Sequence, residues 1–112
     1  MISCEKNIID YRNKYIGEYQ FNVHYSSWDL LNGDFDTTYS NLGRIDCGAD
    51  KKSILIYISD TSTPISAEIF EDGSIEGIYI GEFESTHKLN MHYSSRSPGS
   101  SILEVVIGDK KE

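Results

Sequence analysis

The run YIGEYQFNVHYSS at residues 15–27 decides the fold, and most of it returns near the other end of the chain. There YIGEFE at residues 79–84 and LNMHYSS at residues 89–95 repeat its two halves, separated by the insertion STHK at residues 85–88. Both copies alternate apolar and polar residues, the two-residue period of a strand with one buried and one solvent-facing side. The chain is therefore predicted to be rich in β-strands, with similar strands near its two ends.

The two copies are not expected to fold alike. In the first, the alternation is unbroken, which predicts one continuous strand over residues 15–26 with an inward face of Tyr19, Phe21, Val23 and Tyr25. In the second, the polar insertion at residues 85–88 is best read as a turn, so the same string is expected to occupy two strands. The inward face of the later of these strands is predicted to be Leu89, Met91 and Tyr93.

Turn signals recur along the chain at intervals of about 8 to 12 residues, which is typical of all-β domains. Residues 5–14 instead place Ile8 and Tyr11 at a helical spacing that continues to Tyr15, which predicts a short N-terminal helical segment. No helical segment is long enough to connect two parallel strands. We therefore predict an antiparallel meander of seven to eight strands in a single small barrel or rolled sheet over residues 15–112, preceded by a tether at residues 1–14.

The pair Asp72-Gly73 lies between two apolar runs, which indicates a two-residue hairpin turn. Pairing Glu71 with Ser74 would place five residues on the core face of the two strands: Ile65, Ala67, Ile69, Ile78 and Ile80. A register different by one residue would turn that whole set to the other side.

Residues 27–36 form the longest segment without a clear period, and they contain four large apolar side chains: Trp28, Leu30, Leu31 and Phe35. We expect this segment to fold back as a lid over one end of the barrel. The alternative is a partly exposed patch that contacts a ligand or partner. In either case these four residues are the candidate contact site.

The chain has 10 basic and 18 acidic residues and a net charge of −8. A basic surface for nucleic acid is therefore not expected, and the charge is consistent with a soluble monomer. No apolar run has the length of a membrane-spanning helix.

The chain has two cysteines, Cys4 and Cys47, too few for a disulfide framework. Met1-Ile2-Ser3-Cys4 is similar to the end of a bacterial lipobox, in which the cysteine receives lipid, although a charged and apolar leader is not seen before it. Cys4 is accordingly a candidate lipidation site. A Cys4–Cys47 disulfide and an ordinary N-terminus are the alternatives.

The chain also resembles small bacterial lipoproteins with a lipocalin-like β-meander domain. The resemblance is carried by alternation at residues 15–23, by Asp72-Gly73, by Gly81-x-Phe83, by the run from Leu89 to Tyr93, and by VIGDK at residues 106–110. It implies a β-barrel fold and a location in the cell envelope, and it implies no reaction. The chain is shorter than true lipocalins and lacks their Gly-x-Trp opening, so a deep ligand-binding calyx is not expected.

The polar residues do not form a recognisable catalytic or metal-binding motif. His24 and His92 occupy equivalent places in the two copies, but two histidines alone make a poor zinc site. Ser26 and Ser27 lie too close to His24 in sequence to form a nucleophile-and-base arrangement with an oxyanion hole. The acids Asp29, Asp34 and Asp36 lack the spacing of a calcium-binding loop.

These observations predict a non-enzymatic, envelope-anchored binding or interaction module without a metal or cofactor. Its expected partner is a protein, a glycan or a small apolar ligand, and its expected contact with a membrane is through the lipid anchor alone. The alternatives are a carrier of small apolar ligands and a hydrolase-like enzyme whose cleft the sequence does not reveal.

Overall fold

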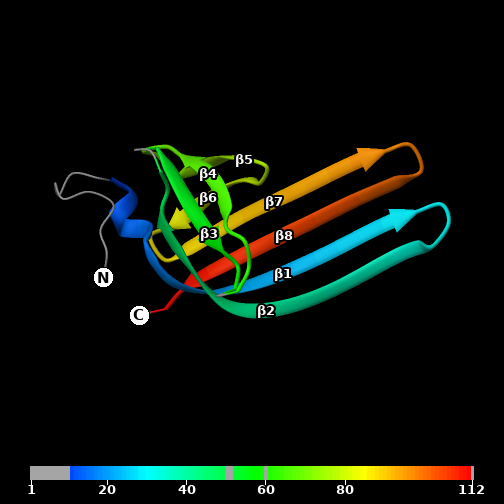
Figure 1. Ribbon diagram of the computed structural model, residues 1–112, viewed down its shortest axis with the longest axis horizontal. Coiled ribbons are helices and arrows are strands. Elements are labelled where there is room, and N and C mark those ends of the chain that lie inside the picture. The colour runs from blue at the N-terminus through cyan, green and yellow to red at the C-terminus, as the bar shows by residue number, and fades with distance from the viewer. Residues whose placement is uncertain (1–10, 50–51, 60, 112) are drawn as a thin grey trace.

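The computed structural model describes residues 11–49, 52–59 and 61–111. Eight antiparallel strands close into a barrel in which each strand pairs with its neighbour in sequence and β8 returns to pair with β1 (Figure 1). The predicted all-β meander is therefore confirmed. The strands are β1 Gly17–Asp29, β2 Gly33–Cys47, β3 Ser53–Tyr57, β4 Ile65–Ile69, β5 Ser74–Gly77, β6 Ile80–Ser85, β7 Lys88–Ser97 and β8 Ser100–Lys110.

The predicted helical segment is represented by one 3-10 turn, η1, at Tyr11–Tyr15. The rest of the tether, with Cys4, lies outside the described residues. Arg12 is buried beside the barrel and donates from Nη1 to the Ser53 carbonyl at 2.8 Å. Within the described ranges, no helix has the length and apolar character needed to cross a bilayer.

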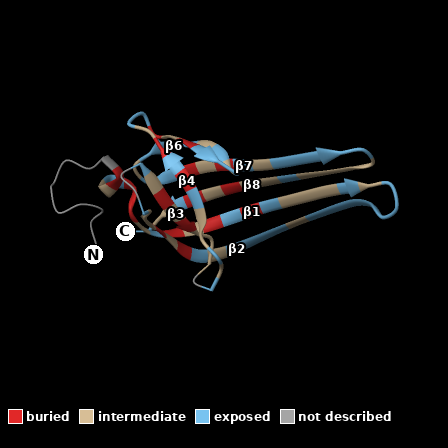
Figure 2. Ribbon diagram, turned by 45° about the horizontal axis from the view of Figure 1, so that its top comes forward, coloured by how far each residue is buried: buried red, intermediate tan, exposed pale blue. Residues whose placement is uncertain are grey.

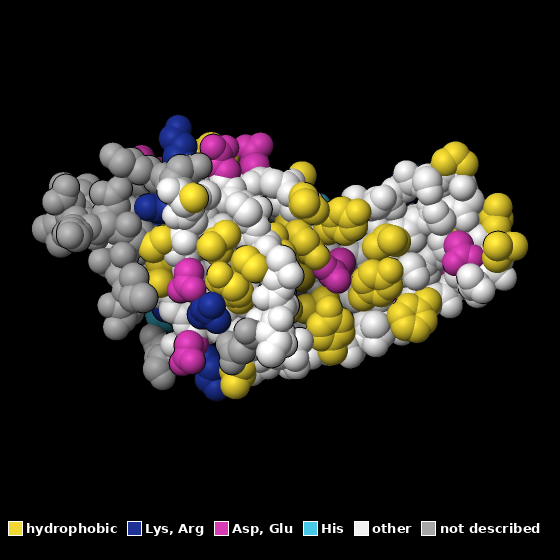
Figure 3. All heavy atoms as spheres, viewed as in Figure 1, with side chains coloured by type: hydrophobic (Ala, Val, Ile, Leu, Met, Phe, Trp, Pro, Cys, Tyr) yellow, Lys and Arg dark blue, Asp and Glu magenta, His cyan; other side chains and the backbone are white. Residues whose placement is uncertain are grey.

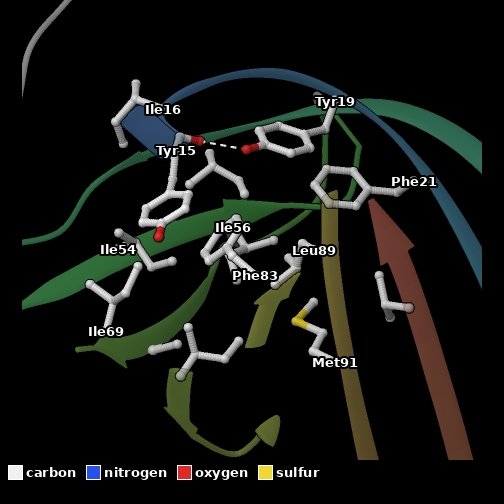
Figure 4. Close-up of a cluster of buried hydrophobic side chains, with 14 of the residues drawn as sticks. Tyr15, Ile16, Tyr19, Phe21, Ile54, Ile56, Ile69, Phe83, Leu89 and Met91 are labelled. Carbon is white, nitrogen blue, oxygen red and sulfur yellow. Dashed lines mark hydrogen bonds between the residues drawn. The ribbon is translucent and has the colours of Figure 1, made fainter. Parts of the chain in front are cut away.

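The core fills the barrel at the end nearer to η1 (Figures 2 and 4). The ring of Tyr15 stacks on Phe83 with centroids 4.1 Å apart, and the Tyr19 hydroxyl donates to the Tyr15 carbonyl at 2.7 Å. Tyr19, Phe21 and Met91 are fully buried, as the alternating pattern predicted. The barrel interior is thus occupied by side chains.

Two hairpins, β1–β2 and β7–β8, extend far beyond this core, and the molecule measures 53 × 25 × 24 Å (Figure 1). Strand β2 pairs with β3 only over Arg44–Cys47, and β7 pairs with β6 only as far as His92. Beyond these points the strands β2, β1, β8 and β7 pair with one another alone. We call this four-stranded extension, residues 24–43 and 93–104, the wall.

The expected lid is wrong, because residues 27–36 continue the two strands and turn at the far tip of the wall. The side chains of Leu30 and Leu31 are 75% and 94% exposed there. The turn is held by Asp29, whose carboxylate accepts from the backbone N–H groups of Leu31 and Asn32 at 2.8 and 2.6 Å. Gly33 follows with φ 75°, a conformation that glycine adopts without strain.

The register predicted at Asp72-Gly73 is also wrong, by one residue. Ala67 pairs with Gly77 and Ile69 with Ile75, because the loop has three residues instead of two. The Phe70 N–H donates to the Ser74 carbonyl at 3.0 Å, and Gly73 takes the positive φ, 91°, that a three-residue loop requires.

Consequently Ile75 lies in the core, whereas Ile78 and Ile80 are 72% and 55% exposed. The chain also turns after Gly77, so residues that were expected to form one strand form β5 and β6 instead.

The different folding of the two sequence copies is confirmed. The first lies on the continuous strand β1, and the second is divided between β6 and β7 by a turn at residues 86–87.

Candidate functional site: a tyrosine-lined carboxylate on the wall

The wall has an inner face, which continues the lining of the barrel, and an outer face. Directly paired residues of antiparallel strands point to the same side. In the ladders, Tyr25 of β1 pairs with Glu104 of β8, and Glu104 pairs with Tyr93 of β7. One carboxylate therefore lies between two tyrosines on the inner face, just beyond the core. In the space-filling view, hydrophobic side chains gather around an acidic one on this face (Figure 3).

Two further tyrosines complete the surroundings of Glu104. Tyr79, in the turn between β5 and β6, donates its hydroxyl to the Glu104 carboxylate and places its ring 5.6 Å from that of Tyr93. Tyr39 of β2 pairs with Val23 and so shares the inner face. Partial burial and then the nearby Glu104 charge raise the pKa of the Tyr39 phenol. We call Tyr25, Tyr39, Tyr79, Tyr93 and Glu104 the tyrosine–glutamate site.

Glu104 is half-buried, and this burial raises the pKa of its carboxyl group. Within residues 11–49, 52–59 and 61–111, no basic side chain forms an ion pair with it. The hydroxyl of Tyr79 is its described polar partner. A half-buried carboxylate that is held by a neutral donor keeps a local negative charge available to a ligand.

A hollow of about 280 Å³ adjoins this carboxylate at the mouth of the barrel. Val23, Ile58 and Val106 form its apolar part, and Ser59, Ser62 and Thr63 add hydroxyl groups. A larger hollow of about 600 Å³ lies further out on the wall, and its lining includes Trp28 and Arg96. The smaller hollow is the one that combines the carboxylate with tyrosine rings.

The four apolar residues predicted as a contact site do not form one patch. Phe35 lies on the inner face, 58% exposed, with its ring 6.2 Å from that of Tyr25. Trp28 pairs with Asp34 and Ser101 on the outer face, and Leu30 and Leu31 lie at the tip. Of the four, Phe35 alone extends the tyrosine–glutamate site.

His24 and His92 lie on the outer face and do not meet. Val105 pairs with both His24 and His92 and lies between them. His24 Nε2 instead contacts the Asp36 carboxylate at 2.7 Å, on an exposed surface. In the part of the chain that the structure describes, no three side chains of metal-binding type cluster together.

The other polar candidates have local roles. Ser26 donates to the Leu103 carbonyl at 3.4 Å and not to a histidine. Asp29 caps the turn at the tip, and the hydrogen bond from the Asn32 backbone is the main reason that the pKa of its carboxyl group is lowered.

Sequence reasoning did not identify Glu104 as a site residue. The signal was nevertheless present, because residues 102, 104 and 106 share one face of β8, and the run Ile102, Glu104, Val106 places an acid among apolar residues. An acid at an inward position needs a partner or an opening to solvent. Here the opening is the mouth of the barrel.

No protein-family model, curated protein or solved structure matches this chain.

Proposed function

We propose that this protein is a non-enzymatic binding module whose partner contacts the inner face of the wall. The observation that carries the proposal is the extension of four strands past the core, with Phe35 and the tyrosine–glutamate site on one side of it. Tyrosine and phenylalanine rings on an extended surface give large contact area, and the tyrosine hydroxyls add hydrogen bonds.

A filled barrel favours surface contact over carriage of an apolar ligand inside. Tyr19, Phe21, Leu89 and Met91 are each 0% exposed and occupy the interior. Eight-stranded barrels have room for side chains or for one small ligand. A filled interior thus supports a partner that binds on the wall and at the mouth, where a protein segment, a glycan or a small molecule has access.

The hydrolase-like alternative has less support from the geometry. A nucleophile needs a base within hydrogen-bond reach and donors for the developing oxyanion. The His24–Asp36 pair is exposed, and Ser26 is directed to a backbone carbonyl.

We further propose a location in the bacterial cell envelope. Cys47 is disulfide-bonded, and disulfides persist in oxidising compartments outside the cytoplasm. The one other cysteine of the chain, Cys4, lies outside the described residues. Lipid attachment at Cys4 and a disulfide through Cys4 exclude each other. Intact mass of the natively produced protein separates them, since acylation adds the mass of lipid and a disulfide removes two hydrogens.

Site-specific photo-crosslinking tests the binding role. A benzoylphenylalanine is placed at Phe35 on the inner face or, as a matched control, at Leu103 on the outer face; these side chains are 58% and 44% exposed. After irradiation of producing cells, we expect discrete adducts from the Phe35 position alone, and the mass of the adduct reports whether the partner is a protein, a glycan or a small molecule. Equal labelling from both positions, or none from Phe35, contradicts the proposal.

A further inference from the structure

We propose that the tyrosine–glutamate site binds a small organic cation, an ammonium carried on a compact apolar body. This inference rests on the binding role proposed above and names the ligand class for the same face. Its basis is the placement of one carboxylate between Tyr25 and Tyr93, with Tyr79 bonded to it and a hollow of about 280 Å³ beside it.

Aromatic rings and a carboxylate attract a cation by two separate mechanisms. The face of a tyrosine ring attracts a cation placed within about 6 Å of its centre, and the attraction grows as water is excluded. The carboxylate adds direct Coulomb attraction, which is stronger at a half-buried position than in bulk water. Tyr39 and Tyr79 line the hollow together with Glu104, and the ring of Tyr93 packs beside that of Tyr79 with centres 5.6 Å apart. A small cation in the hollow would therefore lie beside tyrosine rings and the carboxylate.

The lining of the hollow fits the rest of such a ligand. Val23, Ile58 and Val106 offer apolar contact to methyl or methylene groups, and the hydroxyls of Ser59 and Thr63 offer hydrogen bonds to a polar end. The volume lies near the lower limit of small-molecule pockets, which indicates a compact ligand.

The charge of the chain acts in the same direction. With a net charge of −8 the protein attracts cations and repels anions at long range. The outer-face acid Asp36 provides an internal comparison, because it is 65% exposed and paired with His24. If cations were attracted to any acidic surface, removal of either Asp36 or Glu104 would weaken cation binding. At the proposed site, only removal of Glu104 should do so.

An NMR titration with choline tests this inference, with 3,3-dimethylbutan-1-ol as the neutral control of the same shape. We expect choline to shift the resonances of Tyr25, Tyr79, Tyr93 and Glu104 in a saturable manner, with a Kd of about 1 mM. The neutral alcohol should bind at least about tenfold more weakly. Equal affinity for the two probes, or no saturable shift with choline, overturns the proposal.

Two variants locate the effect. Glu104→Gln should weaken choline binding about tenfold while leaving the weak binding of the alcohol unchanged, and the outer-face control Asp36→Asn should alter neither. The amide spectrum of each variant shows whether it remains folded. Choline affinity that survives Glu104→Gln, or falls equally in Asp36→Asn, contradicts the inference.

The pH dependence supplies an independent readout, since choline keeps its charge at every pH. Among the described residues, the titratable groups that face Glu104 are four phenols. Tyr25 and Tyr93 pair with Glu104 on the neighbouring strands, Tyr79 donates its hydroxyl to the carboxylate, and Tyr39 lies nearby on the same inner face. Choline affinity should therefore fall as the pH is lowered through the raised pKa of Glu104.

The two proposals fail separately. Crosslinking from Phe35 without choline binding leaves the inner face as a contact surface and rejects the cation. Choline binding that depends on Glu104, without crosslinking from Phe35, keeps the cation site and rejects the larger partner surface.

Discussion

Replacing a phenylalanine by alanine should lower the stability of the protein much more in the barrel core than on the wall. Phe21 on β1 and Phe35 on β2 both point to the inner face, but the first is 0% and the second 58% exposed. The Phe21 ring lies against Gly108, where an added Cβ would come within 2.7 Å of it. Replacing a phenylalanine packed in this way by alanine costs about 3–5 kcal/mol.

Phe35→Ala should have a much smaller effect. Complete burial of a phenylalanine side chain contributes about 1.5–3 kcal/mol, and less than half of this side chain is buried. Its edge contact with Tyr25 adds a few tenths of a kcal/mol, at the lower end of the range for aromatic pairs because the site is open to water. We therefore expect Phe35→Ala to lower the free energy of unfolding by about 1 kcal/mol.

Urea denaturation followed by circular dichroism measures both variants, with the slope of the transition used to check that the unfolded surface is comparable. The midpoint should fall strongly for Phe21→Ala and slightly for Phe35→Ala. A loss above about 2.5 kcal/mol for Phe35→Ala would place this ring in the core and remove the reason to regard it as a contact residue. A loss below about 1 kcal/mol for Phe21→Ala would mean that the barrel is not packed as described.

Three other substitutions test separate parts of the structure. Gly43→Ala should destabilise by about 3 kcal/mol or more in a thermal melt, because its Cβ would lie 1.9 Å from the Tyr57 carbonyl oxygen, and a melt near the wild-type midpoint would contradict the close approach of β2 and β3. Tyr19→Phe should lower stability by about 1 kcal/mol through loss of the bond to the Tyr15 carbonyl, and an unchanged urea midpoint would show that this buried bond adds no net stability. Burial raises the folded-state pKa of Glu104, so the wild type should lose stability relative to Glu104→Gln as pH rises from about 4.3 through the raised pKa. Solvent screening should keep that difference below about 1 kcal/mol, and a difference that does not vary between pH 4 and pH 7 in paired urea titrations would refute the assignment.

The parts of the fold that depend on local pattern could be predicted from the sequence. Alternation gave the inward residues of β1 and β7, and the polar insertion correctly divided the second copy into two strands. The register at Asp72-Gly73 could not be obtained in the same way, because two-residue and three-residue loops both suit Asp-Gly. The three-residue loop is stabilised by Asp72, whose carboxylate accepts hydrogen bonds from the backbone N–H and the hydroxyl of Ser74 at 2.9 and 2.6 Å.

The wall follows from a difference in strand length that the even spacing of turn signals did not predict. The hairpins β1–β2 and β7–β8 have strands of 13, 15, 10 and 11 residues, whereas β3 to β6 have only 4 to 6. A barrel can close only over the length of its shortest strands. The parts of the long hairpins that extend past them therefore form an open sheet. The alternation of residues cannot show where the inner face stops being covered. Tyr25 and Tyr93 continue the inward alternation beyond the point at which the opposing strands end. Glu104 marks that point: the inward row changes there from a packed core to a surface that water and a ligand can reach.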